Sequence, residues 1–202
     1  MTTAKKTTTS RKKTTTAKPR VIAQKIPDLP ANPFAFEVLD AASKQKTKAK
    51  KVEALQRYAD PSIKTLFIWN FDPTVISILP AGEVPYGNTK EDGKTTGTLT
   101  SKINDAVGMM NEMGSSSLGS QDQGRSSIRK EYQNFYNFVK GGNDQLSSLR
   151  RETMFINILE GLHPLEAEIV CLVKDKNLES KYKISKEVVL EAYPDIRWGN
   201  RS

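Results

Sequence analysis

The sequence contains only one cysteine and one histidine among 202 residues. A single cysteine excludes an internal disulfide and a zinc site built on several thiolates, and it is typical of a protein made in a reducing compartment. Cys171 lies in the apolar stretch AEIVCLV, so we interpret it as a small core side chain and not as a nucleophile. With one histidine available, a metal site would need carboxylates almost alone, and we predict no metal site and no cofactor.

Long apolar runs are also missing. A membrane-spanning helix needs about 18 consecutive apolar residues, and no stretch of this chain approaches that length. The N-terminus lacks the apolar stretch of a secretory signal. Its Lys, Arg and Thr content is that of an organellar transit peptide, but no apolar face is spaced along it, so this alternative ranks low. The sequence therefore predicts no contact with a membrane.

The first 31 residues contain no aromatic side chain and almost no aliphatic one before Val21, and they repeat a basic-threonine block, KKTTTSRKKTTT, at residues 5–16. Such a segment buries too little apolar surface to offset the entropy lost on folding. We therefore predict that residues 1–31 are a disordered tail, called the basic arm below. Residues 1–33 carry eight basic side chains against Asp28 alone, a net +7, whereas 23 basic and 22 acidic side chains leave residues 34–202 at +1.

The charge split points to a polyanionic partner for the basic arm. A cluster of cations can follow a phosphate backbone and release counterions without reading sequence. The arm is therefore a candidate non-specific contact for DNA or RNA, and the alternative is a solubilising leader without a partner. The candidate nucleic-acid-binding residues are Lys5, Lys6, Arg11, Lys12, Lys13, Lys18 and Arg20.

The rest of the chain predicts a mainly α-helical fold, a single domain over residues 32–202. Asn32 and Asp60, each followed by proline, are expected to begin helices as N-cap residues, and Ser127 and Ser185 are expected to begin two more. Apolar residues at helical spacing predict helices over residues 34–45, 47–59, 62–71, 99–113, 128–140, 149–160, 165–174 and 186–193. The stretch LFIW at residues 66–69 is equally compatible with a short strand.

Two long loops interrupt the predicted helices. Residues 80–98 are rich in proline and glycine, and residues 114–127 read GSSSLGSQDQGRSS, a composition typical of a flexible linker. Loops of this length inside a compact domain are usually functional or disordered.

Three motifs match a known chemical site only in part, and none of them predicts a chemical function. Glu160 and His163 have the E-x-x-H spacing of di-iron bundles, but a second such pair is absent, and we expect His163 near a helix N-cap. Residues 119–126 contain G-x-x-x-x-G followed by Arg-Ser, which lacks the phosphate-binding lysine. The helices near residues 165–174 and 186–193 show acidic side chains where a helix-turn-helix protein would show base-reading ones. The chain is predicted not to be an enzyme.

Two groups of side chains in the helical region are candidates for contact with a protein partner. Arg150 and Arg151 stand at the start of a predicted helix, where the helix dipole disfavours cations, so they either pair with a glutamate of the domain or touch a partner. Met109, Met110 and Met113 form an adaptable apolar surface or, alternatively, fill gaps in the core. The aromatic residues 132, 135, 136 and 138 offer base stacking in principle, but their spacing favours a core role.

Several blocks resemble a known family. FEVLDAASKQKTKAKKVEALQRY, LPAGEVPYGN, FVKGGNDQLSSLRRETMFINILEGLHPLEAEIVCLVKD and EAYPDI resemble small proteins of T-even-like tailed phages, in particular those of phages of marine cyanobacteria. The likeness covers residues 34–202 and is most specific from Lys140 to Lys174. No biochemical role and no site residue follow from it. It implies a phage product made in the cytoplasm of a bacterial host.

Taken together, these features predict a non-enzymatic phage accessory protein. Its basic arm would bind nucleic acid non-specifically, and its helical domain would bind a phage or host protein. One alternative is a structural or assembly component of the virion, in which the domain forms a homo-oligomer. Another is a modulator of a host protein.

Overall fold

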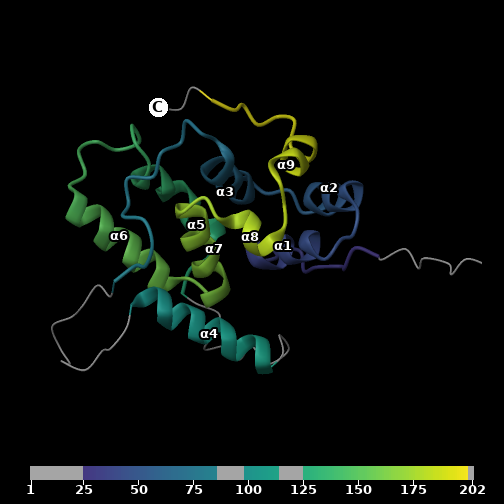
Figure 1. Cartoon of the computed structure of the whole chain (residues 1–202), viewed down its shortest axis with the longest axis horizontal. Helices are drawn as coiled ribbons and strands as arrows, with labels where there is room; N and C mark the ends of the chain where they lie inside the picture. The colour runs from purple at the N-terminus through teal and green to yellow at the C-terminus, as the bar shows by residue number, and fades with distance from the viewer. Residues whose placement is uncertain (1–24, 86–97, 114–124, 200–202) are drawn as a thin grey trace, which may run out of the picture.

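The computed structural model describes residues 25–85, 98–113 and 125–199, and this part of the chain is a helical assembly (Figure 1). The mainly α-helical fold class is therefore confirmed. The elements are α1 (Ala35–Ser43), α2 (Lys48–Arg57), α3 (Pro61–Phe71), α4 (Leu99–Met113), α5 (Ile128–Glu131), the 3₁₀ helix η2 (Tyr132–Phe138), α6 (Ser148–Gly161), α7 (Pro164–Lys174), α8 (Leu178–Tyr182) and α9 (Lys186–Ala192).

Helix α7 is the centre around which the others pack. It contacts α1, α3, α4, α6 and α8, and it lies in the middle of the assembly in Figure 1. Its side chains Ile169, Val170 and Val173 are fully buried, and no residue of α7 on any side of the helix is exposed. A helix that is apolar on more than one side belongs in the interior, where it is surrounded by partners.

The helices around α7 each contribute one apolar face. In α4, Leu99, Ile103 and Val107 are four residues apart, so they share a face, and all three are buried where α4 meets α7. On another side, α2 packs against α1 and α9. The hydroxyl of Tyr193, just after α9, donates a hydrogen bond to the carbonyl oxygen of Leu55 in α2 at 2.8 Å.

Four of the predicted helix starts are confirmed, and one is wrong. Ser127 and Ser185 stand at the N-cap positions of α5 and α9. Asp60 caps α3 by accepting the backbone N–H of Ser62, and His163 caps α7 through Nδ1, which accepts the N–H of Leu165. Residues 66–69 are part of α3 and not a strand. Asn32, however, does not cap α1. The cap residue is Phe34, whose N–H donates to the side chain of Glu37, as in one half of a capping box.

The helix predicted over residues 128–140 is only partly α-helical. One turn, α5, is followed by the 3₁₀ helix η2, and Phe135 and Phe138 in η2 are buried. A 3₁₀ helix has three residues per turn, so side chains three positions apart lie on the same line. Aromatic residues and asparagines are also weak helix formers, which lowers the cost of leaving the α-helical geometry.

Helix α6 forms where predicted, but it buries a different face. The spacing of Leu149, Thr153, Ile156 and Leu159 in the sequence predicts that these side chains share the inward face. Ile156 and Leu159 are buried, whereas Leu149 is 76% exposed and Thr153 is also exposed. The inward face instead includes Arg151, Phe155 and Ile158. The short helix α8 was not predicted, because its five residues are too few to show a helical period.

The predicted start of the domain at residue 32 is too late. Ile26 is 3% exposed and belongs to the core, and the hydroxyl of Tyr58 accepts the backbone N–H of Leu29. Asp28 also forms an ion pair with Arg57. The lead-in from residue 25 is therefore fixed to α2, and only residues 1–24 of the basic arm lie outside the described residues.

The first predicted long loop is held at its beginning. The buried ammonium group of Lys174 donates to the carbonyl oxygens of Pro80 and Gly82, at 2.8 and 3.1 Å, and to the carboxylate of Asp175 at 2.6 Å. Residues 80–85, 98 and 125–127 are described and are not helical. The remaining parts of the two predicted loops, residues 86–97 and 114–124, lie outside the described residues.

Among the described helices, none combines the length and the apolar character that crossing a membrane requires.

Candidate functional site

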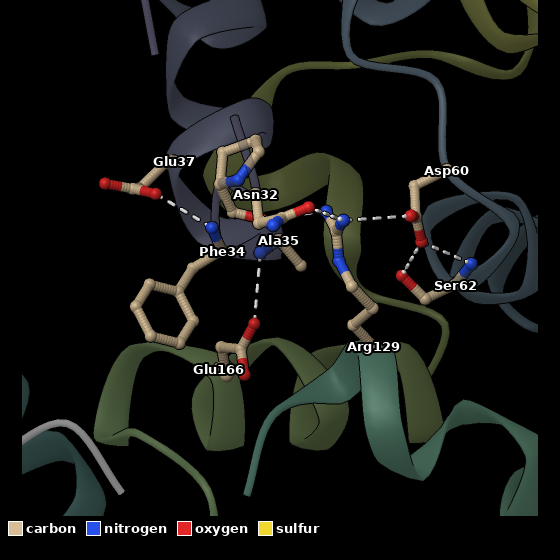
Figure 2. Close-up of polar contacts among 9 residues, drawn as sticks. Asn32, Phe34, Ala35, Glu37, Asp60, Ser62, Arg129 and Glu166 are labelled. Atoms are coloured by element: carbon tan, nitrogen blue, oxygen red, sulfur yellow. Dashed lines mark hydrogen bonds and ion pairs between the residues drawn. The ribbon is translucent and has the colours of Figure 1, made fainter. Parts of the chain in front are cut away.

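A buried carboxylate near the start of the central helix fixes the elements around the candidate site. Glu166 is 1% exposed, and its two oxygens accept the backbone N–H groups of Ala35 at 3.0 Å and Ile128 at 2.9 Å. These donors stand at the first residues of α1 and α5, where helix N–H groups have no partner within their own helix. Figure 2 shows the side chain rising from α7 toward Ala35. Glu166 thus ties two helix starts to a third helix.

Arg129 completes this junction on its exposed side. Its guanidinium donates to the side chain of Asn32 and to the carbonyl oxygen of Pro33, both at 3.1 Å, and it lies 3.4 Å from the carboxylate of Asp60 (Figure 2). Asn32, predicted as a helix cap, is therefore part of the contact between α5 and the segment before α1. One arginine holds the starts of α1, α3 and α5 together.

The residues just before α5 lie against the C-terminal end of α6. The backbone N–H groups of Arg125 and Ser126 donate to the carbonyl oxygen of Gly161, at 2.8 and 2.9 Å. Ser126 and Asn134 in turn donate to the two carboxylate oxygens of Glu131, at 2.6 and 2.9 Å. These contacts form a polar wall that faces helix α6.

Between this wall and α6 lies a groove of about 640 Å³, which we call the α6 groove. Its apolar lining includes Leu146, Leu149, Met154 and Ile158, which recur every three to five residues along the chain. Its polar lining includes the side chain of Arg150. Leu149, at 76% exposed, is the most exposed large apolar side chain among the described residues. Together with the other apolar side chains of the lining, it makes the α6 groove a candidate contact surface.

The two arginines predicted to contact a partner have different environments. Arg150 is exposed and lines the α6 groove, and its role in partner contact stays a prediction. Arg151 is 7% exposed, and its guanidinium donates to the carbonyl oxygens of Asn137, Asn143 and Leu146 at 2.7–2.9 Å. The structure thus gives Arg151 neither of the two predicted roles. It joins η2 to the turn that leads into α6.

The predicted methionine surface is described only in part. Met109 is 63% exposed and Met110 is half-buried, so Met109 does not fill a gap in the core. The side chain of Met113 and the seven candidate nucleic-acid-binding residues lie outside the described part of the chain. Their roles remain predictions.

Among the described residues, no three His, Cys, Asp or Glu side chains are placed to hold a metal ion. Burial raises the pKa of the Cys171 thiol to about 12, which agrees with its interpretation as a core side chain. Burial also raises the pKa of Glu166, but both of its oxygens are occupied by backbone donors. We interpret Glu166 as structural.

Sequence reasoning missed both Glu166 and the α6 groove. The only signal for Glu166 was an acidic side chain in the first turn of a helix, which usually reflects the helix dipole of that same helix. The groove could not be found because Leu149 was assigned to the buried face.

Comparison with protein-family models places the chain in a family. A family of unknown function, DUF6433, matches residues 38–113 and 117–180, which is more than half of the 202 residues. The chain belongs to DUF6433. No curated protein and no solved structure matches it.

The DUF6433 match covers much of the helical domain and none of the basic arm. It spans every element from α2 to α7 completely, η2 included, and it contains Glu166 and the α6 groove. The basic arm lies entirely outside it. The part of the chain that is similar to the family therefore does not include the arm.

Proposed function

We propose that this DUF6433 protein is a non-enzymatic accessory protein that binds nucleic acid through its basic arm and a protein partner through the α6 groove. The observation that carries the proposal is the division of charge, +7 in residues 1–33 against +1 in residues 34–202. A cationic segment attached to a nearly neutral domain binds polyanions through the segment alone.

The distribution of charge on the domain supports this division. The densest basic stretch outside the arm is residues 44–51, with five lysines. Three of these are paired with acidic side chains: Lys44 with Asp40, Lys48 with Glu191 and Lys50 with Glu53. A lysine that is paired with a carboxylate attracts phosphate less strongly, because the nearby carboxylate repels the phosphate.

The α6 groove supports the second half of the proposal. It combines exposed apolar side chains with Arg150 and polar groups at its edge, as protein interfaces combine an apolar centre with a polar rim. Arg150 lies at the rim of the groove, where its charge would contribute more to the rate of association than to the affinity for the partner.

The biological setting belongs to the proposal and rests on the sequence resemblance to T-even-like phage proteins. In that setting the protein acts in the cytoplasm of an infected bacterium. A structural component of the virion is the second candidate, and a modulator of a host protein is the third. Protein identification in purified virions separates the first two, because many copies per particle would support the structural role.

The salt dependence of binding tests the proposed role of the arm. The full chain and a variant lacking residues 1–24 are titrated with duplex DNA and with RNA over a range of salt concentrations. With seven arm cations engaged on duplex DNA, the log-log slope should approach roughly −6, from about −0.9 per phosphate. Deletion should remove both the binding and the slope. Equal binding by the shortened protein would reject the proposal.

The partner is tested in extracts of infected cells. The full chain and a Leu149→Asp variant are used as baits, with Leu190→Asp on α9 as the matched control, because Leu190 is also an exposed leucine but lies outside the groove. A protein retained by the full chain and by Leu190→Asp, and lost with Leu149→Asp, is the predicted partner.

A further inference from the structure

A second cavity, of about 350 Å³, lies between α3 and η2 and has an unusual lining. Trp69 of α3 forms part of its wall, together with Tyr132, Phe135 and Tyr136 of η2. Lys140, just after η2, also lines it. The volume is within the usual range for pockets that hold small ligands, and most of the aromatic side chains of this region meet there.

The indole of Trp69 supplies the first sign of a missing ligand. The side chain is 2% exposed, and its Nε1–H has no acceptor among the described residues. Buried N–H groups in native proteins nearly always have a partner, and an exception requires an explanation. An acceptor atom on a molecule bound in the cavity would provide one.

Tyr136 and Lys140 supply the second sign. Tyr136 is 52% exposed, whereas its neighbours Phe135 and Phe138 are buried in the core. The ammonium group of Lys140 is exposed and makes no ion pair or hydrogen bond with any described residue. An open aromatic face and an unpaired cation therefore lie at the same cavity.

We propose that this cavity binds a nucleotide. Its base would stack on the aromatic side chains and accept the hydrogen bond of Trp69 Nε1, and its phosphate would pair with Lys140. Aromatic side chains bind bases of any sequence, because every base has a stacking face. The ligand is either a free mononucleotide or one nucleotide of a single strand held by the basic arm, and the second source rests on the proposed function.

Tryptophan fluorescence detects the binding directly. Trp198→Phe leaves Trp69 as the only tryptophan of the chain. This protein is titrated with adenosine, with AMP, and with an oligothymidylate single strand. If the cavity takes free mononucleotides, AMP should change the emission of Trp69 and bind more tightly than adenosine, because only AMP carries the phosphate that Lys140 would pair with.

Side-chain variants assign the two contacts. Tyr136→Ala should weaken the binding of both adenosine and AMP by at least about fivefold, the lower end of the stacking contribution of one base. Lys140→Ala should weaken AMP and leave adenosine unchanged. Leu190→Ala and Lys130→Ala are the matched controls, since both residues are exposed and lie outside the cavity.

The N–H resonance of the Trp69 indole gives a readout that a purely structural role would not move. In a ¹⁵N-labelled Trp198→Phe protein it should shift downfield when AMP is added, as an N–H does when it gains an acceptor. Absence of any change in emission and in this resonance, with both AMP and the oligonucleotide, would overturn the inference.

Deletion of residues 1–24 separates this inference from the proposed function. If the cavity binds free mononucleotides, the shortened protein should keep its affinity for AMP. If it binds only nucleotides within a strand, the full chain should show the Trp69 response with the oligonucleotide alone, and Tyr136→Ala should weaken that binding without changing the salt slope. If binding of the strand depends on salt but the Trp69 signal does not change, the result supports nucleic-acid binding by the basic arm and rejects nucleotide binding in the cavity.

Discussion

The Oε1 atom of Glu166 accepts a hydrogen bond from the backbone N–H of Ala35 at 3.0 Å, across 131 positions of the sequence. The other oxygen accepts the N–H of Ile128 at 2.9 Å. One buried side chain therefore satisfies the starts of two helices that are far apart in the chain. Because α5 borders the α6 groove, this contact also positions one wall of the candidate docking surface.

Glu166→Gln should destabilise the protein by about 1–3 kcal/mol, the cost of one unsatisfied buried hydrogen-bonding group. The glutamine amide offers its oxygen to one of the two N–H groups and its NH₂ to the other. The NH₂ group cannot accept a hydrogen bond, so the second N–H loses its partner. The measurement is urea unfolding followed by circular dichroism. Glu179→Gln on α8 is the control, because Glu179 is exposed, and it should change stability by less than about 0.5 kcal/mol. Equal stability of the two variants would contradict the role given to Glu166.

The stability difference between the native protein and Glu166→Gln should change with pH in a direction set by the pKa of Glu166. Burial raises the pKa of Glu166 above its ordinary value of 4.5, so the folded protein holds this proton more tightly than the unfolded chain. The associated stability is fully present below pH 4.5 and is lost as the pH rises through the raised pKa. The difference in unfolding free energy between the native protein and Glu166→Gln should therefore shrink over that interval. A difference that grows with pH would show that the pKa is lowered.

Replacing Arg151 should lower the free energy of unfolding much more than replacing its neighbour Arg150. Arg151→Met removes a guanidinium that donates to three carbonyl oxygens, and we expect a loss of about 3 kcal/mol. Arg150→Met is the matched control and should stay within about 0.5 kcal/mol, because Arg150 is exposed. Thermal and urea unfolding of the two variants provide the comparison. Similar losses in both would remove the distinction between an internal and a surface arginine.

Two glycines should respond to alanine in opposite directions. A Cβ atom on Gly142 would lie 1.8 Å from the carbonyl oxygen of Tyr136, so Gly142→Ala must displace the turn after η2, and we expect a loss of more than about 2 kcal/mol. Gly108 lies within α4 with no atom in the way of a Cβ, so Gly108→Ala should stabilise by about 0.5–1 kcal/mol. Unfolding midpoints measure both, and destabilisation by Gly108→Ala would contradict the described path of α4.

The thiol of Cys171 should be unreactive in the folded protein. Burial raises its pKa to about 12, so almost no thiolate is present at neutral pH. Alkylation should be slow under native conditions and fast in denaturant, where the pKa returns to its ordinary value. Mass spectrometry of the intact protein follows the reaction. Rapid native alkylation would show that α7 is more open than described.

Local signals in the sequence determined where most helices begin and which class of fold they form. Asp60 followed by proline was sufficient for α3, and the four-residue spacing of Leu99, Ile103 and Val107 was sufficient for α4. Each signal lies within one turn or one helix, so it acts before any distant part of the chain is in place. The charge of the basic arm was also readable from composition alone.

Only the tertiary structure decided what the buried polar groups do. Glu166 and Arg151 have the sequence context of surface charges, yet both are buried, since their partners come from other segments. The inward face of α6 and the 3₁₀ geometry of η2 depend likewise on what packs against them. The α6 groove and the cavity lined by Trp69 depend on these tertiary contacts and could not be predicted from residue spacing. Long-range contacts select among conformations that local sequence leaves nearly equal in energy, and that selection formed both candidate sites.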